Sequence, residues 1–244
     1  MPRLDWNIHQ WDGEYNWELK GEEWSSSWGS SEAQWFGSLY PRLHKYLPAR
    51  RILEIAPGFG RWTRFLLNYC DDYTGIDLSD ECVNACRQTF SEVESARFFK
   101  NDGLSLEGAA GQYDFVFSFD SLVHADIEVF DSYLPAILKL LRPDGAAFIH
   151  HSNFKGSGEA TNIHNRSENV TGQYVRSVVE KHGGSILIQE KINWGSKSLI
   201  DCLTIFDNRG SHRGPLSIDN PGFMEEAENC KRIVNQYCSN LTRL

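Results

Sequence analysis

A short glycine-containing stretch near residue 55 has the residue types that a nucleotide-like ligand requires. The segment 51–63 reads RILEIAPGFGRWT, in which an apolar run is followed by Gly58 and Gly60 and then by a helix-like sequence. An apolar run that ends in turn residues is typical of a buried parallel strand. Glycine lets the backbone approach a ligand closely, and the free N–H groups at the start of the next helix favour an electron-rich group. The stretch therefore predicts a strand, a tight turn and a helix that together hold a nucleotide-like cofactor.

Acidic side chains lie at the ends of three apolar runs. Glu54 lies just before the glycine turn, Asp77 ends the run at 73–77, and Asp102 follows the run at 96–100. In an open parallel sheet, ligands bind beyond the carboxyl ends of the strands, and an acid about 20 residues after a glycine turn can accept hydrogen bonds from ribose hydroxyls. Asp77 comes 17 positions after Gly60. These acids predict a ribose-binding site that also suits a cationic ligand.

The negative charge of Glu54 at the turn distinguishes between two candidate cofactors. An NAD site has the pattern G-x-G-x-x-G, but Thr63 occupies the third glycine position and Glu54 would repel a pyrophosphate. S-adenosylmethionine carries an ammonium, a sulfonium, a ribose and an adenine, and these groups match an acid-lined site. We therefore expect S-adenosylmethionine as the cofactor. A non-catalytic nucleotide-binding protein or an NAD-dependent oxidoreductase is the alternative from a different class.

The elements that must position these residues alternate between strands and helices. This alternation predicts a doubly wound, Rossmann-like α/β fold, because each right-handed crossover between parallel strands needs a helix. After the fifth strand the alternation loosens into a polar loop at 154–169, which is too long for a plain connector. We expect strands at 51–55, 73–77, 96–100, 113–119, 146–151, 186–191 and 199–206, and helices at 30–46, 61–68, 81–89, 130–141, 167–182 and 223–237.

Five motifs resemble, in the same order, those of the class I S-adenosylmethionine-dependent methyltransferases. The resemblance covers roughly residues 32–206 and implies a mostly parallel seven-stranded sheet whose last strand, 199–206, is antiparallel. The first motif departs from the family pattern, because Ala56 replaces its first glycine. The motifs are LEIAPGFG (53–60), the ribose motif TGIDLS (74–79), the adenine motif NDG (101–103), YDFVFSFDSLVH (113–124) and LLRPDGAAFIH (140–150).

The same resemblance implies which residues contact the cofactor. In the family, Asp77 corresponds to the ribose-binding acid and Asp102 to a residue that faces the adenine amine. The residues implied as cofactor-binding are Glu54, Ala56, Gly58, Gly60, Trp62, Asp77, Leu78, Asp102, Gly103, Ser118 and Phe119.

Three histidines are candidates for a general base. Methyl transfer is an in-line displacement at an activated sulfonium methyl, so the protein must align the acceptor and can remove a proton from it. Histidine suits this task near neutral pH, and His124, His150 and His151 lie at the ends of expected strands. Because neighbours on a strand point to opposite faces, one of His150 and His151 should face the cleft, and we favour His151. The alternative is that these histidines orient loops through hydrogen bonds.

Polar and aromatic residues are expected around the methyl acceptor. The segments HHSNF (150–154), NIHNRS (162–167) and INWGSKSLIDCLTIF (192–206) are similar to those of bacterial sugar O-methyltransferases. This resemblance implies methyl transfer to a hydroxyl of a sugar or glycan precursor, with N-methylation of an amino sugar or small amine as the alternative. No metal is predicted, because the spacing of the acids and histidines at 120–151 is not diagnostic of a metal site. The alternative is that Asp120, Asp126, His150 and His151 hold a divalent metal, as in the metal-dependent O-methyltransferases. The expected substrate-binding residues are Trp28, Trp35, Asp120, Asn153, His164, Arg166 and Trp194.

The first 36 residues hold six of the eight tryptophans without a helical or strand period. They either wrap the domain as buried anchors or form a lid whose indoles stack on a substrate ring. We divide the chain into a tryptophan-rich cap or lid (1–36), a methyltransferase domain (37–207) and a C-terminal loop and helix (208–244).

The composition narrows the choice of partners. The chain has 244 residues and a net charge of −9, which argues against a nucleic-acid backbone as the ligand. No apolar stretch approaches the ~20 residues of a membrane helix, and the six scattered cysteines suit reduced thiols in the cytoplasm. We therefore expect a cytoplasmic enzyme with a small-molecule acceptor, no nucleic-acid or membrane partner, and a possible homodimer.

Overall fold

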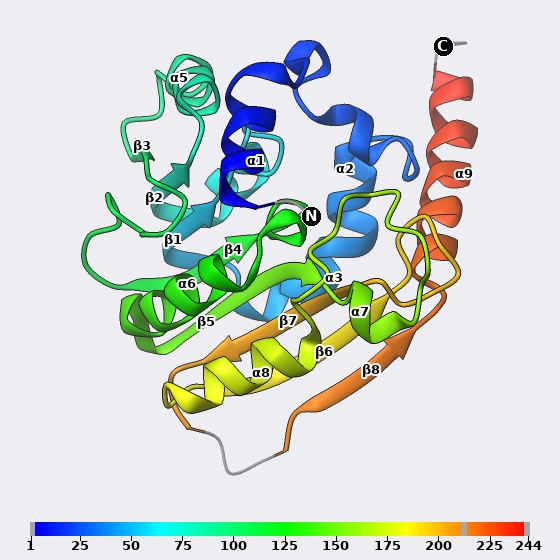
Figure 1. Cartoon of the computed structure of the whole chain (residues 1–244). Helices are drawn as coiled ribbons and strands as arrows, with labels where there is room; N and C mark the ends of the chain where they lie inside the picture. Colours follow the sequence, from blue (N-terminus) through cyan, green and yellow to red (C-terminus); the bar gives the residue numbers. More distant parts are fainter. Residues whose placement is uncertain (1–2, 211–213, 242–244) are drawn as a thin grey trace.

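The computed structural model describes residues 3–210 and 214–241, which form an eight-stranded sheet with helices on both faces (Figure 1). The strand order is β3-β2-β1-β4-β5-β7-β6-β8, so the order reverses beside β1. The strands are β1 (Ala49–Ile55), β2 (Cys70–Asp77), β3 (Ala96–Lys100), β4 (Tyr113–Ser118), β5 (Leu141–Ser152), β6 (Ser185–Ile192), β7 (Asp201–Asp207) and β8 (Leu216–Asn220).

The direction of the strands confirms the expected fold class. Among the described strands, β7 runs antiparallel to both β5 and β6, and the remaining neighbours pair in parallel. Strand β5 begins earlier than expected, because residues 142–145 continue the strand and Leu141 pairs with Tyr113 across an irregularity in β4. The first five strands therefore occupy the predicted places, with changes at their ends.

Strand β8 corrects the expected number of strands from seven to eight. It pairs in parallel with β6, from Ile188 opposite Leu216 to Ile192 opposite Asn220. The strand lies in the C-terminal segment 208–244, which we expected to contain a loop and a helix. Its sequence LSIDN has no buried side chain, so it lacks the apolar run on which the other strands were recognised.

Several helices, among them α5 and α8, begin after a residue whose side chain caps them. Ser79 accepts the N–H of Cys82 at the start of α5, and Thr171 accepts the N–H of Tyr174 at the start of α8. Helix α8 therefore begins at Gly172, five residues later than expected, because Thr171 takes the cap position. The main helices are α5 (Asp80–Thr89), α6 (Ile127–Leu140), α8 (Gly172–Lys181) and α9 (Phe223–Leu241), and the short ones are α1 (Leu4–His9), α2 (Ser31–Gln34), α3 (Tyr40–Leu43), α4 (Thr63–Leu66) and α7 (Phe154–Ser157).

Two apolar cores fill the two faces of the sheet. One core packs strand residues such as Phe115 and Phe148 against the segment 28–47 and the start of α9, and the other packs Val116 and Ile149 against α6 and α8. The expected helix at 30–46 consists of α2, a π-helical turn at Trp35–Leu39, α3 and a final 3-10 turn. This interrupted helix supplies large buried side chains to the first core.

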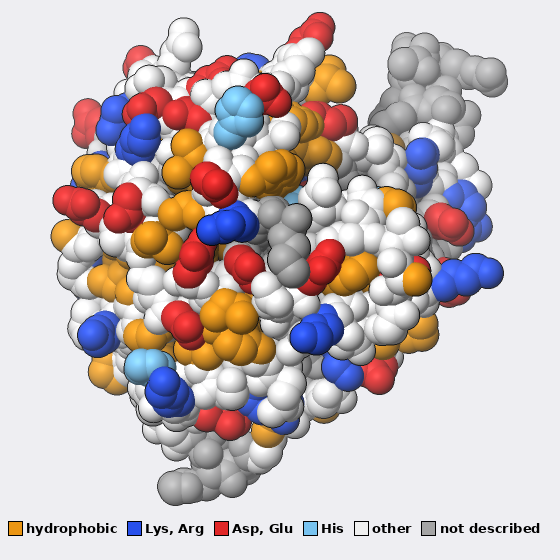
Figure 2. Space-filling view, viewed as in Figure 1, with side chains coloured by type: hydrophobic (Ala, Val, Ile, Leu, Met, Phe, Trp, Pro, Cys, Tyr) orange, Lys and Arg blue, Asp and Glu red, His pale blue; other side chains and the backbone are white. Residues whose placement is uncertain are grey.

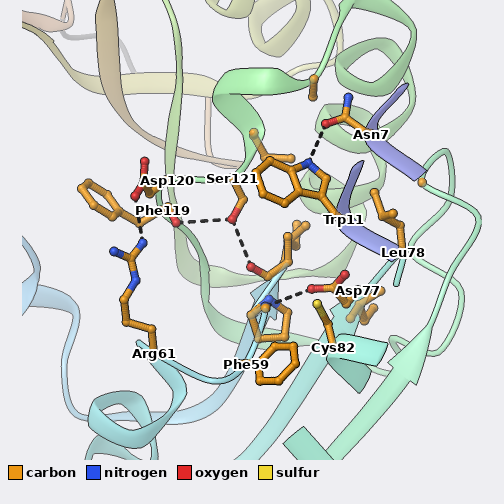
Figure 3. A pocket seen from close by; sticks show the side chains of 18 of the residues that line it. Asn7, Trp11, Phe59, Arg61, Asp77, Leu78, Cys82, Phe119, Asp120 and Ser121 are labelled. Carbon is orange, nitrogen blue, oxygen red and sulfur yellow. Dashed lines mark hydrogen bonds and ion pairs between the residues drawn. The ribbon is translucent and has the colours of Figure 1, made fainter. Parts of the chain in front are cut away.

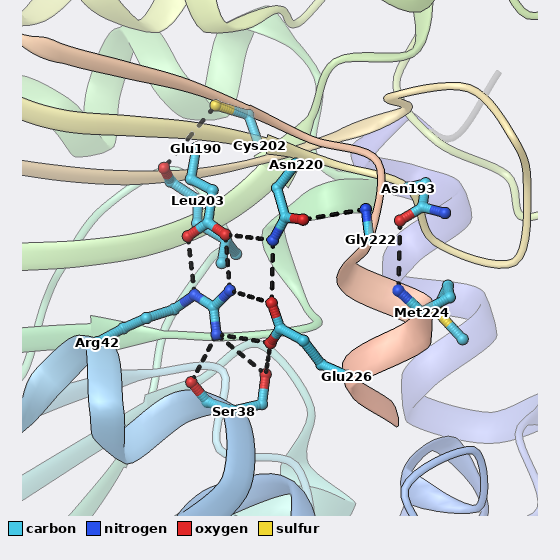
Figure 4. A network of polar contacts seen from close by, with 10 residues as sticks. All are labelled: Ser38, Arg42, Glu190, Asn193, Cys202, Leu203, Asn220, Gly222, Met224 and Glu226. Carbon is cyan, nitrogen blue, oxygen red and sulfur yellow. Dashed lines mark hydrogen bonds and ion pairs between the residues drawn. The ribbon is translucent and has the colours of Figure 1, made fainter. Parts of the chain in front are cut away.

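A cluster of charged side chains attaches the C-terminal segment to this helix (Figure 4). The guanidinium of Arg42 donates to both carboxylate oxygens of Glu190 on β6, at 2.7 and 2.6 Å, and also to Glu226 on α9. Asn220, at the end of β8, donates to the same two carboxylates. Desolvation alone would raise the pKa of Glu190, but its hydrogen bond and charge contact with Arg42 hold that pKa below its usual value. The cluster therefore joins the N-terminal helix, the sheet edge and the last helix.

The surface is mixed in charge. On the face shown in Figure 2, acidic and basic side chains are interspersed with separate apolar side chains. Among the residues that the structure describes, no helix is both long enough and apolar enough to cross a membrane.

Candidate active site

A cavity of about 900 Å³, partly open to solvent, lies at the carboxyl ends of β1, β2 and β4 (Figure 3). This is the edge where open parallel sheets bind their ligands. Its floor comes from the strand ends and the glycine turn, and includes Ala56, Gly58, Asp77 and Phe119. Its cover comes from residues 4–25, which we call the roof.

The glycine turn bends through the left-handed region of backbone space. Ala56 has φ +57°, Gly58 has φ +58° and Gly60 has φ +85°. Ala56 and Gly58 line the cavity, whereas a Cβ at Gly60 would lie 2.5 Å from the ring of Phe90. Gly60 therefore permits the end of α5 to pack closely on the turn, and Gly58 lets the backbone form part of the floor.

Asp77 lies on the floor at the end of β2. One carboxylate oxygen accepts the N–H of Gly58 and the other accepts the N–H of Ser79, each at 3.0 Å. Burial raises the pKa of this carboxyl to about 6, against the lowering effect of these N–H groups. The carboxylate thus links the glycine turn to the start of α5, and Leu78 and Gly103 line the cavity beside it.

Besides Gly60, three residues that we expected to bind the cofactor do not line this cavity. Glu54 lies under the turn, where it is buried and accepts hydrogen bonds from Thr63 and Tyr73, and burial raises its pKa to about 7. Ser118 donates to the carbonyl oxygen of Ile55 and so joins β4 to β1. Asp102 is exposed and accepts the N–H groups of the next loop residues, while its neighbours Asn101 and Gly103 face the cavity. These side chains stabilise the floor through hydrogen bonds made beneath it or beside it and do not face the cavity.

An ion pair forms the end of the cavity away from Asp77. Arg61 donates to the Asp120 carboxylate at 2.8 Å, and both side chains are less than a tenth exposed. The guanidinium also lies over the rings of Trp24 and Trp62, at 5.1 and 4.5 Å from their centroids. Asp120 and Trp62 were expected at the site, but Arg61 was not. The sequence did carry one signal for Arg61, namely its position directly after Gly60, the last glycine of the turn.

The roof places three tryptophans over the floor. Trp11, Trp17 and Trp24 line the cavity, together with Leu4 and Asn7. The indole of Trp17 stacks on Phe59 of the glycine turn, with centroids 4.6 Å apart. Trp11 donates to the Asn7 side chain at 3.0 Å, and Asn7 in turn donates to the carbonyl oxygen of His124 at 2.9 Å. The cover is therefore fixed to both the turn and the segment after β4.

Trp28 and Trp35, which we expected to contact substrate, do not reach the cavity. Both indoles are fully buried in the first core. Trp28 packs against Trp194 and Phe223, and Trp35 stacks on Phe65 with centroids 5.3 Å apart. Burial of these large side chains against the sheet explains why they face inward.

The three candidate bases have different surroundings. His151 is fully buried beside Phe130 of α6, and its ring nitrogens lie 2.8 Å from the Ser152 carbonyl oxygen and 2.7 Å from the Thr204 hydroxyl. The expectation that His151 faces the cleft therefore does not match the structure, because the strand alternation directs it to the α6 face. His150 faces the opposite core and contacts Asp120. Of the three, His124 is the one that contacts the roof.

His124 lies under the roof, close to the rings of Trp6 and Trp11. Its Nδ1 lies 2.8 Å from the carbonyl oxygen of Asn165, so a neutral ring presents Nε2 as its acceptor. Loss of hydration, together with the charge of Arg166, lowers the pKa of this imidazole to about 4. The histidine is therefore neutral at pH 7 and is a weak base.

The other expected substrate residues support the loops beyond β5. Arg166 forms a two-point ion pair with Asp201, at 2.9 and 2.8 Å, and Asn153 donates to the carbonyl oxygen of Leu199. Trp194 packs against Trp28 and Phe119, which both belong to the first core, and His164 lies against Gly195. Within the described residues, no group of three or more His, Cys, Asp or Glu side chains could hold a metal ion.

Comparison with known proteins agrees with this fold. Residues 52–145 match the family model described as a methyltransferase domain. The chain is 31% identical over 143 residues to the putative methyltransferase YqeM of Bacillus subtilis, which is 50% of this chain and 56% of that protein. The chain thus spans about half the length of the curated relatives it matches.

Solved structures share the same architecture. An S-adenosylmethionine-dependent methyltransferase from Clostridium acetobutylicum superposes with a TM-score of 0.59 at 12% identity, over 79% of this chain and 95% of that one. The N-methyltransferase NodS from Bradyrhizobium japonicum gives a TM-score of 0.57 at 16% identity, over 76% and 97% of the two chains.

The fold is that of the class I S-adenosylmethionine-dependent methyltransferases. Residues 52–145 are similar to the methyltransferase domain that the family model describes.

Proposed function

We propose that this protein transfers the methyl group of S-adenosylmethionine to a small-molecule acceptor held between the roof and the strand ends. One observation carries the proposal: a single cavity joins Asp77 at one end to the buried Arg61–Asp120 pair at the other. S-adenosylmethionine has the same order of groups, with a nucleoside at one end and a zwitterionic amino acid at the other. Asp77 would accept the ribose hydroxyls, as an acid at this strand end can.

The charges at the other end fit the amino-acid part of the cofactor. The Arg61 guanidinium would take the carboxylate and the Asp120 carboxylate would take the ammonium, since charge-assisted hydrogen bonds are the strong ones. Trp11 and Trp17 would lie near the sulfonium, and aromatic faces attract cations. A Cβ at Gly58 would lie 3.3 Å from the Trp17 ring, so a side chain there would press the floor against the roof. The residues present thus suit the group chemically.

Within the reaction, the protein's own contribution would be alignment and exclusion of water. The roof covers the floor with apolar rings, and a water-poor site strengthens the electrostatic contacts inside it. A bound sulfonium supplies an already activated methyl group, so a correctly placed acceptor needs little further chemistry.

We infer a nitrogen acceptor, such as an amino sugar or another small amine. A neutral amine attacks without a strong base, whereas an alkyl hydroxyl needs its proton removed. His151 has both ring nitrogens in hydrogen-bond contact and His150 is buried against Asp120, so neither is placed to accept a proton from the cavity. NodS, which shares the fold, is named an N-methyltransferase.

A hydroxyl acceptor is the second candidate, and His124 is the observation that favours it. Its Nε2 is the acceptor nitrogen of a ring that touches the roof, and a general base contributes about 10²–10⁴-fold. His124→Gln would then reduce methylation of a sugar or phenol by about 10²-fold or more. Amine methylation would change by less than about threefold, because a neutral amine needs no base.

The experiment that tests the proposed function begins with calorimetry. S-adenosylhomocysteine should bind, and NADH should not. Methyl-labelled S-adenosylmethionine is then offered with a panel of amines, amino sugars, sugars and phenols, and labelled products are identified by mass. Binding of NADH without S-adenosylhomocysteine would reject a methyltransferase, and label appearing on hydroxyls alone would reject the nitrogen acceptor.

A further inference from the structure

A row of buried polar and charged groups lies behind the Arg61–Asp120 pair, and methyl transfer as described above does not use it. His150 lies on β5, Asp201 at the start of β7 and Arg166 in the loop after β5, and each is less than 5% exposed. Burying charged and polar side chains costs free energy unless they are paired. Their arrangement therefore needs an explanation beyond the packing of the core.

Asp120 is the member of the pair that this row contacts. Its backbone has φ +62°, a left-handed conformation that is uncommon for residues other than glycine. Its N–H donates to Nδ1 of His150 at 3.2 Å, while its carboxylate accepts from Arg61 at 2.8 Å. The imidazole therefore holds the backbone of Asp120 in the conformation that directs the carboxylate to Arg61.

The ring of His150 is itself fixed in orientation and in tautomer. It stacks on Phe119, with centroids 4.7 Å apart, and also packs against Trp194, with centroids 5.4 Å apart. Its Nε2 lies 3.2 Å from the Asp201 carboxylate, although outside the alignment of a good hydrogen bond. Arg166 keeps that carboxylate ionised, and the pKa of Asp201 lies well below its usual value despite its burial. A negative neighbour at Nε2 places the proton there and leaves the lone pair on Nδ1 for Asp120.

We propose that His150 is a positioning residue for the amino-acid end of the cofactor. It fixes Asp120, and through Asp120 the Arg61 guanidinium, in the geometry that receives a carboxylate and an ammonium. This inference rests on the proposed function, because it assigns the Arg61–Asp120 pair to S-adenosylmethionine. Both ring nitrogens face protein groups, so His150 acts through Asp120 and does not act on the acceptor.

Two ligands that differ by the amino-acid group provide the readout. S-adenosylhomocysteine has that group, and 5′-methylthioadenosine lacks it but keeps the nucleoside and the sulfur. Affinities of both are measured by calorimetry for the whole protein and for His150→Asn and His150→Gln. The Asn side chain places an acceptor oxygen near the position of Nδ1, whereas the Gln side chain places its polar atoms near Nε2, toward Asp201.

His150→Asn should bind S-adenosylhomocysteine within about threefold of the original protein. His150→Gln should weaken it about tenfold, the size expected when a buried N–H loses its acceptor. The affinity for 5′-methylthioadenosine should change by less than about twofold in both variants. A purely structural histidine would instead change the affinities of the two ligands together.

His151→Asn is the matched control. It removes a buried imidazole from the adjacent position of the same strand, on the opposite face. It should lower the thermal midpoint of unfolding while the ratio of the two affinities stays that of the original protein.

If His150→Gln weakens both ligands equally, so that the ratio of their affinities is unchanged, the proposed role of His150 is overturned. If the original protein binds 5′-methylthioadenosine and S-adenosylhomocysteine equally well, the pair does not receive the amino-acid group. Failure to bind either ligand would instead reject the proposed function.

Discussion

The tryptophan-rich stretch at the N-terminus divides into two regions with opposite uses. In residues 28–46, which we call the anchor, Trp28 and Trp35 are fully buried in the core against the sheet. In the roof, Trp11, Trp17 and Trp24 line the cavity, and they pack mainly on one another and on the glycine turn. The same residue type thus stabilises the fold in one region and encloses a ligand site in the other.

The difference follows from what each region can pack against. The anchor lies on the continuous apolar face of the sheet, where burial of a large ring is strongly favourable. The roof lies over the carboxyl ends of the strands, where the floor is a turn with buried acids and an open volume. We therefore expect changes in the anchor to affect stability, and changes in the roof to affect ligand affinity.

The largest expected effect is the loss of an anchor indole. Trp35→Ala should lower the free energy of unfolding by about 3–5 kcal/mol, because it leaves a cavity in a packed core. Denaturant unfolding measures this change. Phe36→Ala is the control, because its ring is half exposed at 51%, and it should cost less than about 1 kcal/mol. Equal effects of the two changes would mean that the anchor is not a core element.

The second prediction concerns Asp77, the acidic side chain on the floor beneath the roof. Asp77 has a pKa of about 6 in the ligand-free protein, and ribose hydroxyls donate to its ionised form. The affinity for S-adenosylhomocysteine should therefore be highest above pH 7 and fall as the pH decreases through 6, by about tenfold between pH 7 and 5. Calorimetry at several pH values measures this fall. Asp77→Asn should bind about tenfold more weakly at pH 7 and lose this dependence, and a fall that persists in the variant would assign the titration to another group.

The floor was the part of the site that could best be predicted from the sequence. The strand–turn–helix pattern is local, so it predicted the positions of Gly58 and Asp77, and the structure places both in the lining of the cavity. The direction of a side chain was harder to predict. Glu54 and Ser118 lie at the expected strand ends but point into the protein, because strand alternation and the turn decide which neighbour faces the ligand.

The roof and strand β8 could not be predicted from local patterns. Residues 4–25 form short helical turns without an apolar period, so the sequence does not distinguish Trp17, which lines the cavity, from Trp28, which is buried. Only the tertiary contact with Phe59 or with Phe223 separates the two indoles. Similarly, β8 is recognised by its pairing with β6 and has no apolar run of its own.

A third test removes one indole from the roof. Trp11→Ala should weaken S-adenosylhomocysteine by about 1 kcal/mol, the size of an aromatic contact. The free energy of global unfolding should change by less than about 1 kcal/mol, because a peripheral segment can open locally. Trp6→Ala is the matched control: Trp6 contacts both Trp11 and His124 but does not line the cavity. If Trp11→Ala destabilises the fold as much as Trp35→Ala, the roof and the anchor are one unit.

The smallest expected effect comes from the bend that aims two roof indoles at the cavity. Lys20 and Gly21 have φ +55° and +81°, and this pair reverses the chain so that Trp17 and Trp24 lie 5.7 Å apart. A Cβ at Gly21 would meet the Trp24 ring at 3.0 Å, and the left-handed conformation costs a non-glycine residue about 1 kcal/mol. Gly21→Ala should therefore weaken S-adenosylhomocysteine about two- to threefold by displacing Trp24, because the roof can relax part of this strain.

Gly13→Ala tests whether that effect is local to the bend. Gly13 also belongs to the roof, but a Cβ there meets nothing within 4 Å and its φ is not left-handed. The affinity of this variant, measured by the same calorimetry, should equal that of the original protein. If both alanine variants weaken binding alike, the roof responds to backbone stiffness in general. If only Gly21→Ala does, the bend places Trp24, and through it the guanidinium of Arg61 that lies 5.1 Å from the Trp24 ring.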